Sequence, residues 1–189
     1  MSAVRICSFL WIGFCMIWLL AGLVTKQVHE RTDVVSRLLY GAPVILGFYL
    51  LFSGRLPVSW LDLRLFTQSE LVGILGVSFT ALGIAFAIWA RLHIGQNWSS
   101  TPTVKVGHEL IRTGPYAWVR HPIYSGLLLA ACGTAIAHAR LRGILAIAFV
   151  WIGFAIKSRI EESLMAKTFG EAYESYSQST GALLPKFRI

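Results

Sequence analysis

The sequence predicts an all-α integral membrane protein with about five transmembrane helices, a tight hairpin between the fourth and fifth, and a cytoplasmic C-terminal helix. Hydrophobic residues make up 56% of the 189-residue chain and charged residues only 14%, whereas soluble domains average about 25% charged residues. Five apolar runs approach the roughly 20 residues that a membrane-spanning helix needs. The polar residues gather in a few segments between and after these runs.

The first three spans are expected at residues 6–24, 38–52 and 71–90. The first is longer than the apolar region of a signal peptide, roughly 7–15 residues, and lacks a small-residue cleavage site, so we expect a retained helix. Pro43 should bend or weaken the second span, because proline lacks the N–H that a helix interior uses. The amphipathic connector at residues 55–70 carries Trp60, which favours a position in the membrane interface.

Two further spans are expected at residues 123–137 and 141–156. Because so few residues separate them, they must form a tight antiparallel hairpin. The longest polar segment, residues 91–121, precedes this hairpin, and a charged tail with a helical pattern begins at residue 157. We therefore interpret residues 1–189 as one membrane domain, in which 1–90 hold three spans and 91–189 hold two spans and the C-terminal helix.

The distribution of basic residues predicts the orientation. With the N-terminus outside, twelve of the 17 Lys and Arg residues face the cytoplasm and five face outward, as the positive-inside rule requires. The segment 91–121 and the tail then share one compartment and can build one site. We expect an integral protein of a bacterial inner (cell) membrane, with this site facing the cytoplasm. We attribute the net charge of +8 to basic residues that contact anionic membrane lipids. No basic run or aromatic-interleaved patch supports nucleic-acid binding.

The three cysteines predict neither a metal site nor a disulfide framework. Cys7, Cys15 and Cys132 all lie inside apolar runs. None of them has another Cys or a His at the spacing of a metal site. We therefore expect no bound metal.

The stretch TGPYAWVRHPIYSG, residues 113–126, is unusually polar and rigid for its position between apolar runs. Pro122 suits the first residue of a helix, where its missing N–H costs nothing. His121 then falls at the N-cap, beside free N–H groups that attract anions, and Arg120 adds a charge. Alternatively, Arg120 and His121 reach lipid headgroups while Tyr116 and Tyr124 join an aromatic belt. That alternative explains a single polar residue better than it explains the whole cluster.

A second polar cluster, KSRIEESLMAKTFGEAYESY, begins the tail. Helical spacing predicts one face with Lys157, Glu161, Met165, Phe169, Tyr173 and Tyr176. Glu161 then lies on an apolar face, while Glu162 and Glu171 point elsewhere. A buried carboxylate needs a partner. Spacing leaves two partners open: Lys157 or Arg159 in an ion pair, or a ligand that carries hydroxyls or an ammonium.

The segments GHELIRTGPYAWVRHPIYSG and EESLMAKTFGEAYESY, in this order, closely resemble the isoprenylcysteine carboxyl methyltransferase family. Related membrane methyltransferases, including phospholipid N-methylating enzymes, share the general pattern. The likeness covers roughly residues 95–185, with the closing Leu-Leu-Pro at 183–185, while the first three spans match in hydropathy alone. The ordered set of motifs is more specific than His-Pro-x-Tyr by itself.

The resemblance implies S-adenosyl-L-methionine as cofactor and makes residues 91–189 the cofactor-binding catalytic core. The cofactor-contacting positions carried over are His108, Glu109, Leu110, Ile111, Tyr116, His121, Pro122, Ile123, Tyr124 and Glu161. Lys157 stands where the family often has a substrate-side arginine, and Arg159 lies two residues further on. Which of the two meets the acceptor stays open, and Arg120 is a third candidate.

The implied reaction is carboxyl O-methylation of a lipophilic acceptor, such as a prenylated cysteine, that enters from the bilayer. A carboxylate is already ionised at neutral pH and needs no general base. An amine, thiol or phenol acceptor would need a proton acceptor, for which His108 and His121 are candidates. The alternatives are N- or S-methylation of a lipid or small hydrophobic acceptor, a nicotinamide-dependent membrane reductase, and a non-catalytic scaffold. The sequence specifies neither the acceptor nor the oligomeric state.

Overall fold

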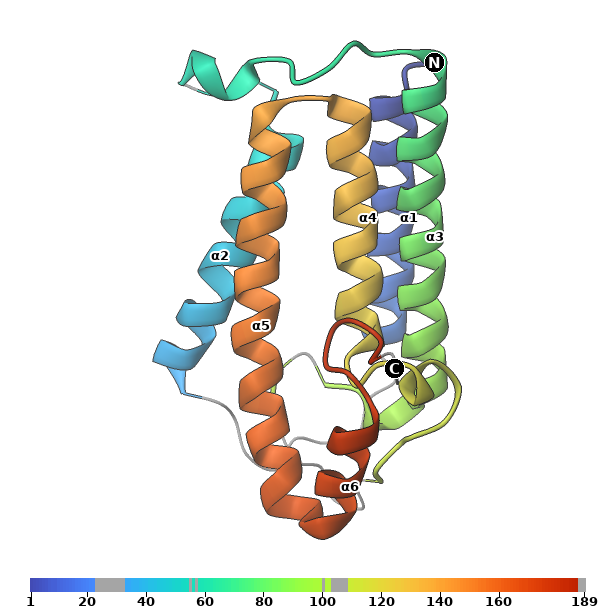
Figure 1. Cartoon of the computed structure of the whole chain (residues 1–189), viewed down its shortest axis with the longest axis vertical. Coiled ribbons are helices and arrows are strands. Elements are labelled where there is room, and N and C mark those ends of the chain that lie inside the picture. The colour runs from blue at the N-terminus through green and yellow to red at the C-terminus, as the bar shows by residue number, and fades with distance from the viewer. Residues whose placement is uncertain (23–32, 55, 57, 100, 103–108, 187–189) are drawn as a thin grey trace.

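The computed structural model describes residues 1–22, 33–54, 56, 58–99, 101–102 and 109–186. Throughout these residues the protein is a bundle of α-helices, with short 3₁₀-helices and isolated β-bridges in the connections (Figure 1). The α-helices are α1 Ala3–Gly22, α2 Val34–Phe52, α3 Glu70–Ile94, α4 Pro122–His138, α5 Leu141–Phe169 and α6 Glu171–Ser179. The 3₁₀-helices are η1 Ser59–Asp62, η2 Gly95–Asn97 and η3 Gly114–Ala117.

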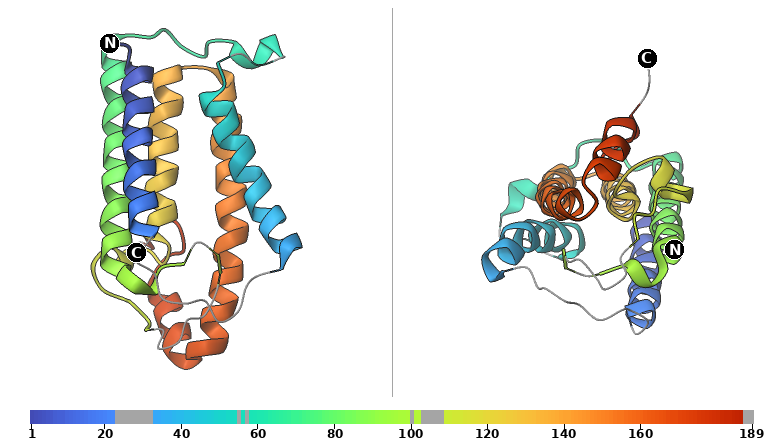
Figure 2. Two further views of the ribbon diagram at one scale, coloured as in Figure 1. Left: turned by 180° about the vertical axis from the view of Figure 1, so that it is seen from behind. Right: turned by 90° about the horizontal axis from the view of Figure 1, so that it is seen from below.

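Helices α1 to α5 run up and down the bundle in alternating directions (Figures 1 and 2). Helices α1, α2, α3 and α5 are long and apolar enough to cross a membrane, and α4 is a shorter apolar helix of 17 residues. The predicted all-α membrane fold is therefore confirmed. So is the tight hairpin, because α4 ends at His138 and α5 begins at Leu141.

The largest differences between the observed and the expected helix boundaries occur in three helices. Helix α2 begins earlier, where Asp33 caps it by accepting a hydrogen bond from the Ser36 N–H at 3.0 Å, and it continues through Pro43. Helix α3 extends past residue 90 to Ile94. Helix α5 does not end at residue 156 but continues to Phe169, with a total length of 29 residues, because neither Gly nor Pro occurs between residue 156 and Gly170.

Gly170 ends α5 with a φ of +50°, a left-handed conformation that favours glycine. This break corrects the predicted helical face. Lys157 to Phe169 share α5, but Tyr173 and Tyr176 lie on the separate helix α6. The chain therefore turns back, so that α6 packs against the lower part of α5 (Figure 1), and Arg120, just before α4, contacts the Ser177 carbonyl of α6.

Glycines allow α3 and α4 to pack closely along their length. A Cβ atom on Gly83 would collide with the backbone of Gly126 and Ala130, and one on Gly126 would lie 2.6 Å from the Gly83 carbonyl oxygen. Small residues permit this approach between membrane helices, where close van der Waals packing drives association. Helix α1 joins them through Trp11, whose Nε1 donates a 3.0 Å hydrogen bond to Thr134 Oγ1.

Helices α2 and α5 form a second close pair beside α1, α3 and α4 (Figure 2). Gly47 faces the Ala146 carbonyl oxygen and Gly153 faces that of Tyr40, each with no room for a side chain. The start of α4 and the lower part of α5 consequently meet at one end of the bundle (Figure 1), which brings together the two polar clusters that the sequence separates.

Candidate functional site

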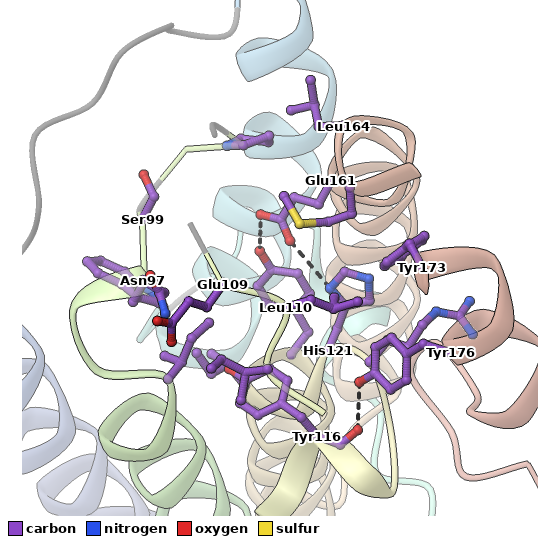
Figure 3. A pocket seen from close by; sticks show the side chains of 18 of the residues that line it. Asn97, Ser99, Glu109, Leu110, Tyr116, His121, Glu161, Leu164, Tyr173 and Tyr176 are labelled. Atoms are coloured by element: carbon purple, nitrogen blue, oxygen red, sulfur yellow. Dashed lines mark hydrogen bonds and ion pairs between the residues drawn. The ribbon is translucent and has the colours of Figure 1, made fainter. Parts of the chain in front are cut away.

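A pocket opens at this end of the bundle (Figure 3). Its lining is mostly apolar with a few convergent polar side chains, as is typical of small-molecule sites. Its walls come from the end of α3 and the segment after it, from residues 109–111, from η3, and from α4, α5 and α6. Segments far apart in the sequence therefore share one concave site.

A carboxylate and a phenol meet at the junction of α4 and α5. Tyr124 donates a hydrogen bond from its hydroxyl to Glu161 Oε1 at 2.7 Å. His121 Nδ1 lies 3.3 Å from Glu161 Oε2 (Figure 3). Glu161 thus contacts two groups at the start of α4, and the charge of Lys157, one of the two cations that spacing suggested, also acts on it. The remaining surface of Glu161 lines the pocket.

His121 contacts two carboxylates through its two ring nitrogens. Its Nε2 lies 3.1 Å from Glu162 Oε1, and its Nδ1 faces Glu161. Both nitrogens can donate only in the imidazolium form. Burial lowers the pKa of His121, but the hydrogen bonds to the two carboxylates outweigh burial and raise it above its ordinary value. The geometry therefore favours an imidazolium between the two carboxylates.

The local sequence explains how His121 reaches α5. Pro122 is the first residue of α4 and His121 is its N-cap, as predicted. The His121 side chain makes no capping hydrogen bond to the helix, so the imidazole is free to face the carboxylates. Behind it, the rings of Tyr124 and Phe154 continue a stack: His121–Tyr124 centroids are 5.5 Å apart and Tyr124–Phe154 centroids 4.8 Å, all nearly parallel.

Lys157 lies between two tyrosine rings, one turn before Glu161 on α5. Its Nζ is 5.3 Å from the ring centroids of both Tyr40, on α2, and Tyr124, on α4. Aromatic faces attract such a cation. Arg159, by contrast, is exposed. Of the two cations that the sequence left open, Lys157 is the one held at the helix junction beside the pocket.

Arg120 fastens α6 to the pocket. Its guanidinium contacts Glu162 Oε1 at 2.8–2.9 Å and donates to the backbone carbonyls of Ser177 and Thr180. The backbone reinforces this contact, because the Arg120 and His121 N–H groups donate to the carbonyls of Gly181 and Ala182. All three guanidinium nitrogens of Arg120 already have partners in the protein. This favours a positioning role for Arg120 over the predicted contact with the acceptor.

The opposite wall of the pocket contains Asn97 and Tyr116. Asn97 Oδ1 is buried and has no hydrogen-bond partner in the described part of the chain. Tyr116 is buried, and its carbonyl accepts a 2.6 Å hydrogen bond from the Tyr176 hydroxyl (Figure 3). Burial raises the pKa of Tyr116 well above its usual range and that of Tyr176 to about 12. Both phenols are therefore neutral at physiological pH.

The structure gathers most of the predicted cofactor-contacting residues around this one pocket. Those that line it are Glu109, Leu110, Ile111, Tyr116, His121, Ile123, Tyr124 and Glu161. Pro122 begins α4 without lining the pocket, and His108 is outside the described residues. Arg120 lines the pocket, whereas Lys157 and Arg159 do not. That these residues hold a cofactor or an acceptor stays a prediction.

The sequence interpretation missed two polar residues of the site. Glu162, which was expected to point elsewhere, contacts the same His121 as Glu161. Adjacent helix positions point about 100° apart, but the start of α4 lies between them and both side chains reach it. Asn97 was not among the candidate site residues. No local signal distinguishes it, because its burial depends on segments distant in sequence.

The sequence of this chain is similar to those of known methyltransferases and of a metal-resistance protein. A family model described as phospholipid methyltransferase matches residues 71–172. The protein-S-isoprenylcysteine O-methyltransferase of Saccharomyces cerevisiae is 30% identical over 130 residues, which is 66% of this chain and 54% of the relative. The nickel-cobalt-cadmium resistance protein NccN of Alcaligenes xylosoxydans xylosoxydans is 30% identical over 69% of this chain and 54% of its own length. The chain thus spans about half the length of these relatives.

A solved structure is also similar. It is that of a eukaryotic intramembrane Ras methyltransferase, isoprenylcysteine carboxyl methyltransferase, with a TM-score of 0.56 and 25% sequence identity. The match covers 80% of this chain and 51% of that one. The helical arrangement described above therefore has a counterpart in a membrane-embedded enzyme.

Proposed function

Because the chain belongs to the phospholipid methyltransferase family and is related to the isoprenylcysteine O-methyltransferases, we propose that it is a membrane methyltransferase dependent on S-adenosyl-L-methionine. The proposed reaction is O-methylation of the carboxylate of a lipophilic acceptor, such as a prenylated cysteine. The acceptor reaches the site from the bilayer. The pocket faces the cytoplasm of a bacterial cell whose inner membrane holds the protein.

The residues of the pocket fit this cofactor chemically. When bound, S-adenosylmethionine supplies a methyl group on a positively charged sulfur. The Glu161 carboxylate and the tyrosine faces around it favour a cation. The buried, unpartnered Asn97 Oδ1 suits an N–H donor, such as an ammonium or an adenine amino group. The N-terminus of α4 suits a carboxylate group.

Lys157 is proposed to hold the acceptor carboxylate. It is a cation placed between Tyr40 and Tyr124, one turn from Glu161, where helices from both halves of the bundle meet. The rings around it keep water away and limit the positions that an acceptor can take, and such alignment is what a transfer between two bound groups chiefly requires. Arg120 keeps α6 in place and so completes the pocket wall.

The placement of His121 between two carboxylates is the observation that most favours a carboxylate acceptor. An amine or thiol acceptor would need a group that takes up its proton, and His121 is the histidine that could do so in the described part of the pocket. Both of its nitrogens face carboxylates, and its pKa is raised. An imidazolium held in this way has no lone pair to accept a proton. A carboxylate nucleophile requires none.

A methyl-transfer assay with purified protein tests the proposal. Donor labelled in the methyl group is mixed with N-acetyl-S-farnesylcysteine, with the same compound blocked as an amide, or with phosphatidylethanolamine. We expect label to enter the free-carboxylate acceptor alone and to be released as methanol by base, which is typical of a methyl ester. Label in phosphatidylethanolamine and not in farnesylcysteine would instead support N-methylation and contradict the assigned acceptor chemistry.

A further inference from the structure

Residues at the opposite end of the bundle line a second cavity. The connector between α2 and α3 crosses this end (Figure 1). The starts of α1 and α3, the end of α2 and the α4–α5 hairpin surround the cavity. Three arginines line it: Arg64 on the connector, and Arg140 and Arg142 at the hairpin. Neither the proposed methyl transfer nor its pocket involves these residues.

Arg64 and Arg140 are held directly opposite each other by a single antiparallel β-bridge. The flanking residues make its hydrogen bonds, since the Leu65 N–H donates to Ala139 at 2.9 Å and the Leu141 N–H to Leu63 at 3.0 Å. In such a pair the two side chains are at their closest. Like charges placed directly opposite destabilise the pairing, so this arrangement calls for an anion between or beside them.

The carboxylates on the protein do not balance these arginines. Asp62 Oδ1 lies 2.8 Å from Arg140 and 3.3 Å from Arg142, so one oxygen serves two guanidinium groups. Glu70, at the exposed start of α3, also lines the cavity. Among the described residues no ion pair involves Arg64. The cavity therefore keeps an excess of positive charge.

Two buried polar atoms in the same cavity lack hydrogen bonds. Arg142 is only 3% exposed, and within the described chain its Nε has only a 3.3 Å ion-pair contact with Asp62 Oδ1, which does not form a hydrogen bond. His138 Nε2 is likewise buried without a partner there. Native proteins satisfy most such atoms, because leaving them unpaired costs about 1–3 kcal/mol each. The weakly paired Arg142 N–H therefore favours a further hydrogen-bond acceptor in the cavity.

We propose that this cavity binds a phosphate group, supplied by the headgroup of an anionic phospholipid from the leaflet at this end of the bundle. Guanidinium groups bind phosphate oxygens with strong, charge-assisted hydrogen bonds. The apolar residues Ile6, Ile74 and Val77 continue the cavity wall toward the bilayer, where the acyl chains lie. Soluble phosphate has the same oxygen chemistry but lacks chains for this apolar wall.

A binding experiment with the full chain in neutral detergent tests the site. The probes are short-chain phosphatidylglycerol, phosphatidylcholine of equal chain length, and inorganic phosphate, each titrated while unfolding temperature and affinity are measured. We expect phosphatidylglycerol to bind wild type best, and Arg64→Gln with Arg140→Gln to weaken it at least about tenfold, the loss expected for one or two charge-assisted hydrogen bonds. Arg112→Gln, a matched charge removal at the other end, should leave the affinity unchanged.

The outcomes separate the sources of the phosphate. Inorganic phosphate that binds as well as the lipid, with the same loss in the double variant, would identify a soluble anion as the ligand of this phosphate site. Equal binding of both lipids, or binding unaffected by the arginine substitutions, would overturn the proposal. Arg64→Gln alone gives the same test if removing Arg140 from Asp62 unfolds the connector. Affinity for S-adenosylhomocysteine should be unchanged throughout, so failure here is distinct from failure of the proposed function.

Discussion

Tyr124 on α4 donates a 2.7 Å hydrogen bond to Glu161 on α5, and this contact joins the two polar clusters that lie 37 residues apart in the chain. It forms only when the two helices are packed, and it gives the partly buried Tyr124 hydroxyl the partner that a buried polar group needs. The contact therefore ties the folded bundle to the chemistry of the pocket. Its consequences can be measured one residue at a time.

Tyr124→Phe should weaken binding of S-adenosylhomocysteine by about tenfold or more. The change removes the hydrogen bond to a charged acceptor, which is worth about 1.5–3 kcal/mol, and keeps the ring stack with His121 and Phe154. Titration calorimetry of the folded variant measures the loss. Tyr49→Phe, which alters an exposed tyrosine on α2, is the matched control, and equal affinities in all three proteins would refute the role of this contact.

Lys157→Met should spare cofactor binding and lower kcat/KM for the carboxylate acceptor by about tenfold or more, because it removes the cation that holds the acceptor. Arg159→Met should behave like wild type, since Arg159 is exposed. Steady-state kinetics at saturating cofactor, with calorimetry alongside, checks both variants. If Arg159→Met is the impaired variant and Lys157→Met is not, the assignment of the acceptor cation is wrong.

Arg120→Gln should loosen α6 and not merely slow the reaction. The substitution leaves Glu162 with a weaker partner and the carbonyls of Ser177 and Thr180 without one. Breaking a partly buried pair of this kind costs up to about 3–5 kcal/mol. Hydrogen exchange should increase in residues 171–183 and change little in α1. Unchanged exchange together with lost turnover would instead place Arg120 on the acceptor.

The pH dependence of stability should report on His121. Its pKa in the folded protein is raised above the ordinary value of 6.5, so the two carboxylate contacts stabilise the fold fully below that value. This contribution is lost as the pH rises through the elevated folded-state pKa. The unfolding temperature of wild type should therefore exceed that of His121→Gln most at about pH 5–6, and the gap should narrow toward about pH 9. A gap that widens with pH would contradict the assigned imidazolium.

Gly83→Ala should destabilise the bundle by about 1–3 kcal/mol, because its new methyl group would overlap the α4 backbone. Gly41→Ala is the control on α2, where nothing lies within 4 Å of the added atom. That substitution should be neutral or slightly stabilising, since alanine favours a helix. Thermal unfolding in detergent compares the two, and equal effects would argue against close α3–α4 packing.

Much of the site could be predicted because its parts have local signals. The fixed φ of Pro122 marks the start of a helix, and the His-Pro-x-Tyr run places His121 and Tyr124 one turn apart. The family resemblance stated from these motifs is confirmed by the match over residues 71–172 and by the isoprenylcysteine methyltransferase relatives. Helix spacing also placed Glu161 on the inward face of the tail.

The rest depends on how the helices meet. The length of α5 was underestimated because hydropathy falls at residue 157 while helical propensity continues to the break at Gly170. Glu162 joined the site because α4 begins between the two glutamates, a position that spacing along one helix does not give. The burial of Asn97 is likewise a tertiary effect. The opposed Arg64 and Arg140 become visible only when the connector pairs with the hairpin.

The central claim is that the pocket around Glu161 binds S-adenosylmethionine, and titration calorimetry of the purified protein with S-adenosylhomocysteine tests it most directly, with NADPH in parallel. We expect saturable binding of S-adenosylhomocysteine at one site and no heat from NADPH. Binding of NADPH alone would point to a reductase. If the folded protein binds neither ligand, the result would point to a scaffold. Either result would contradict the proposed methyltransferase.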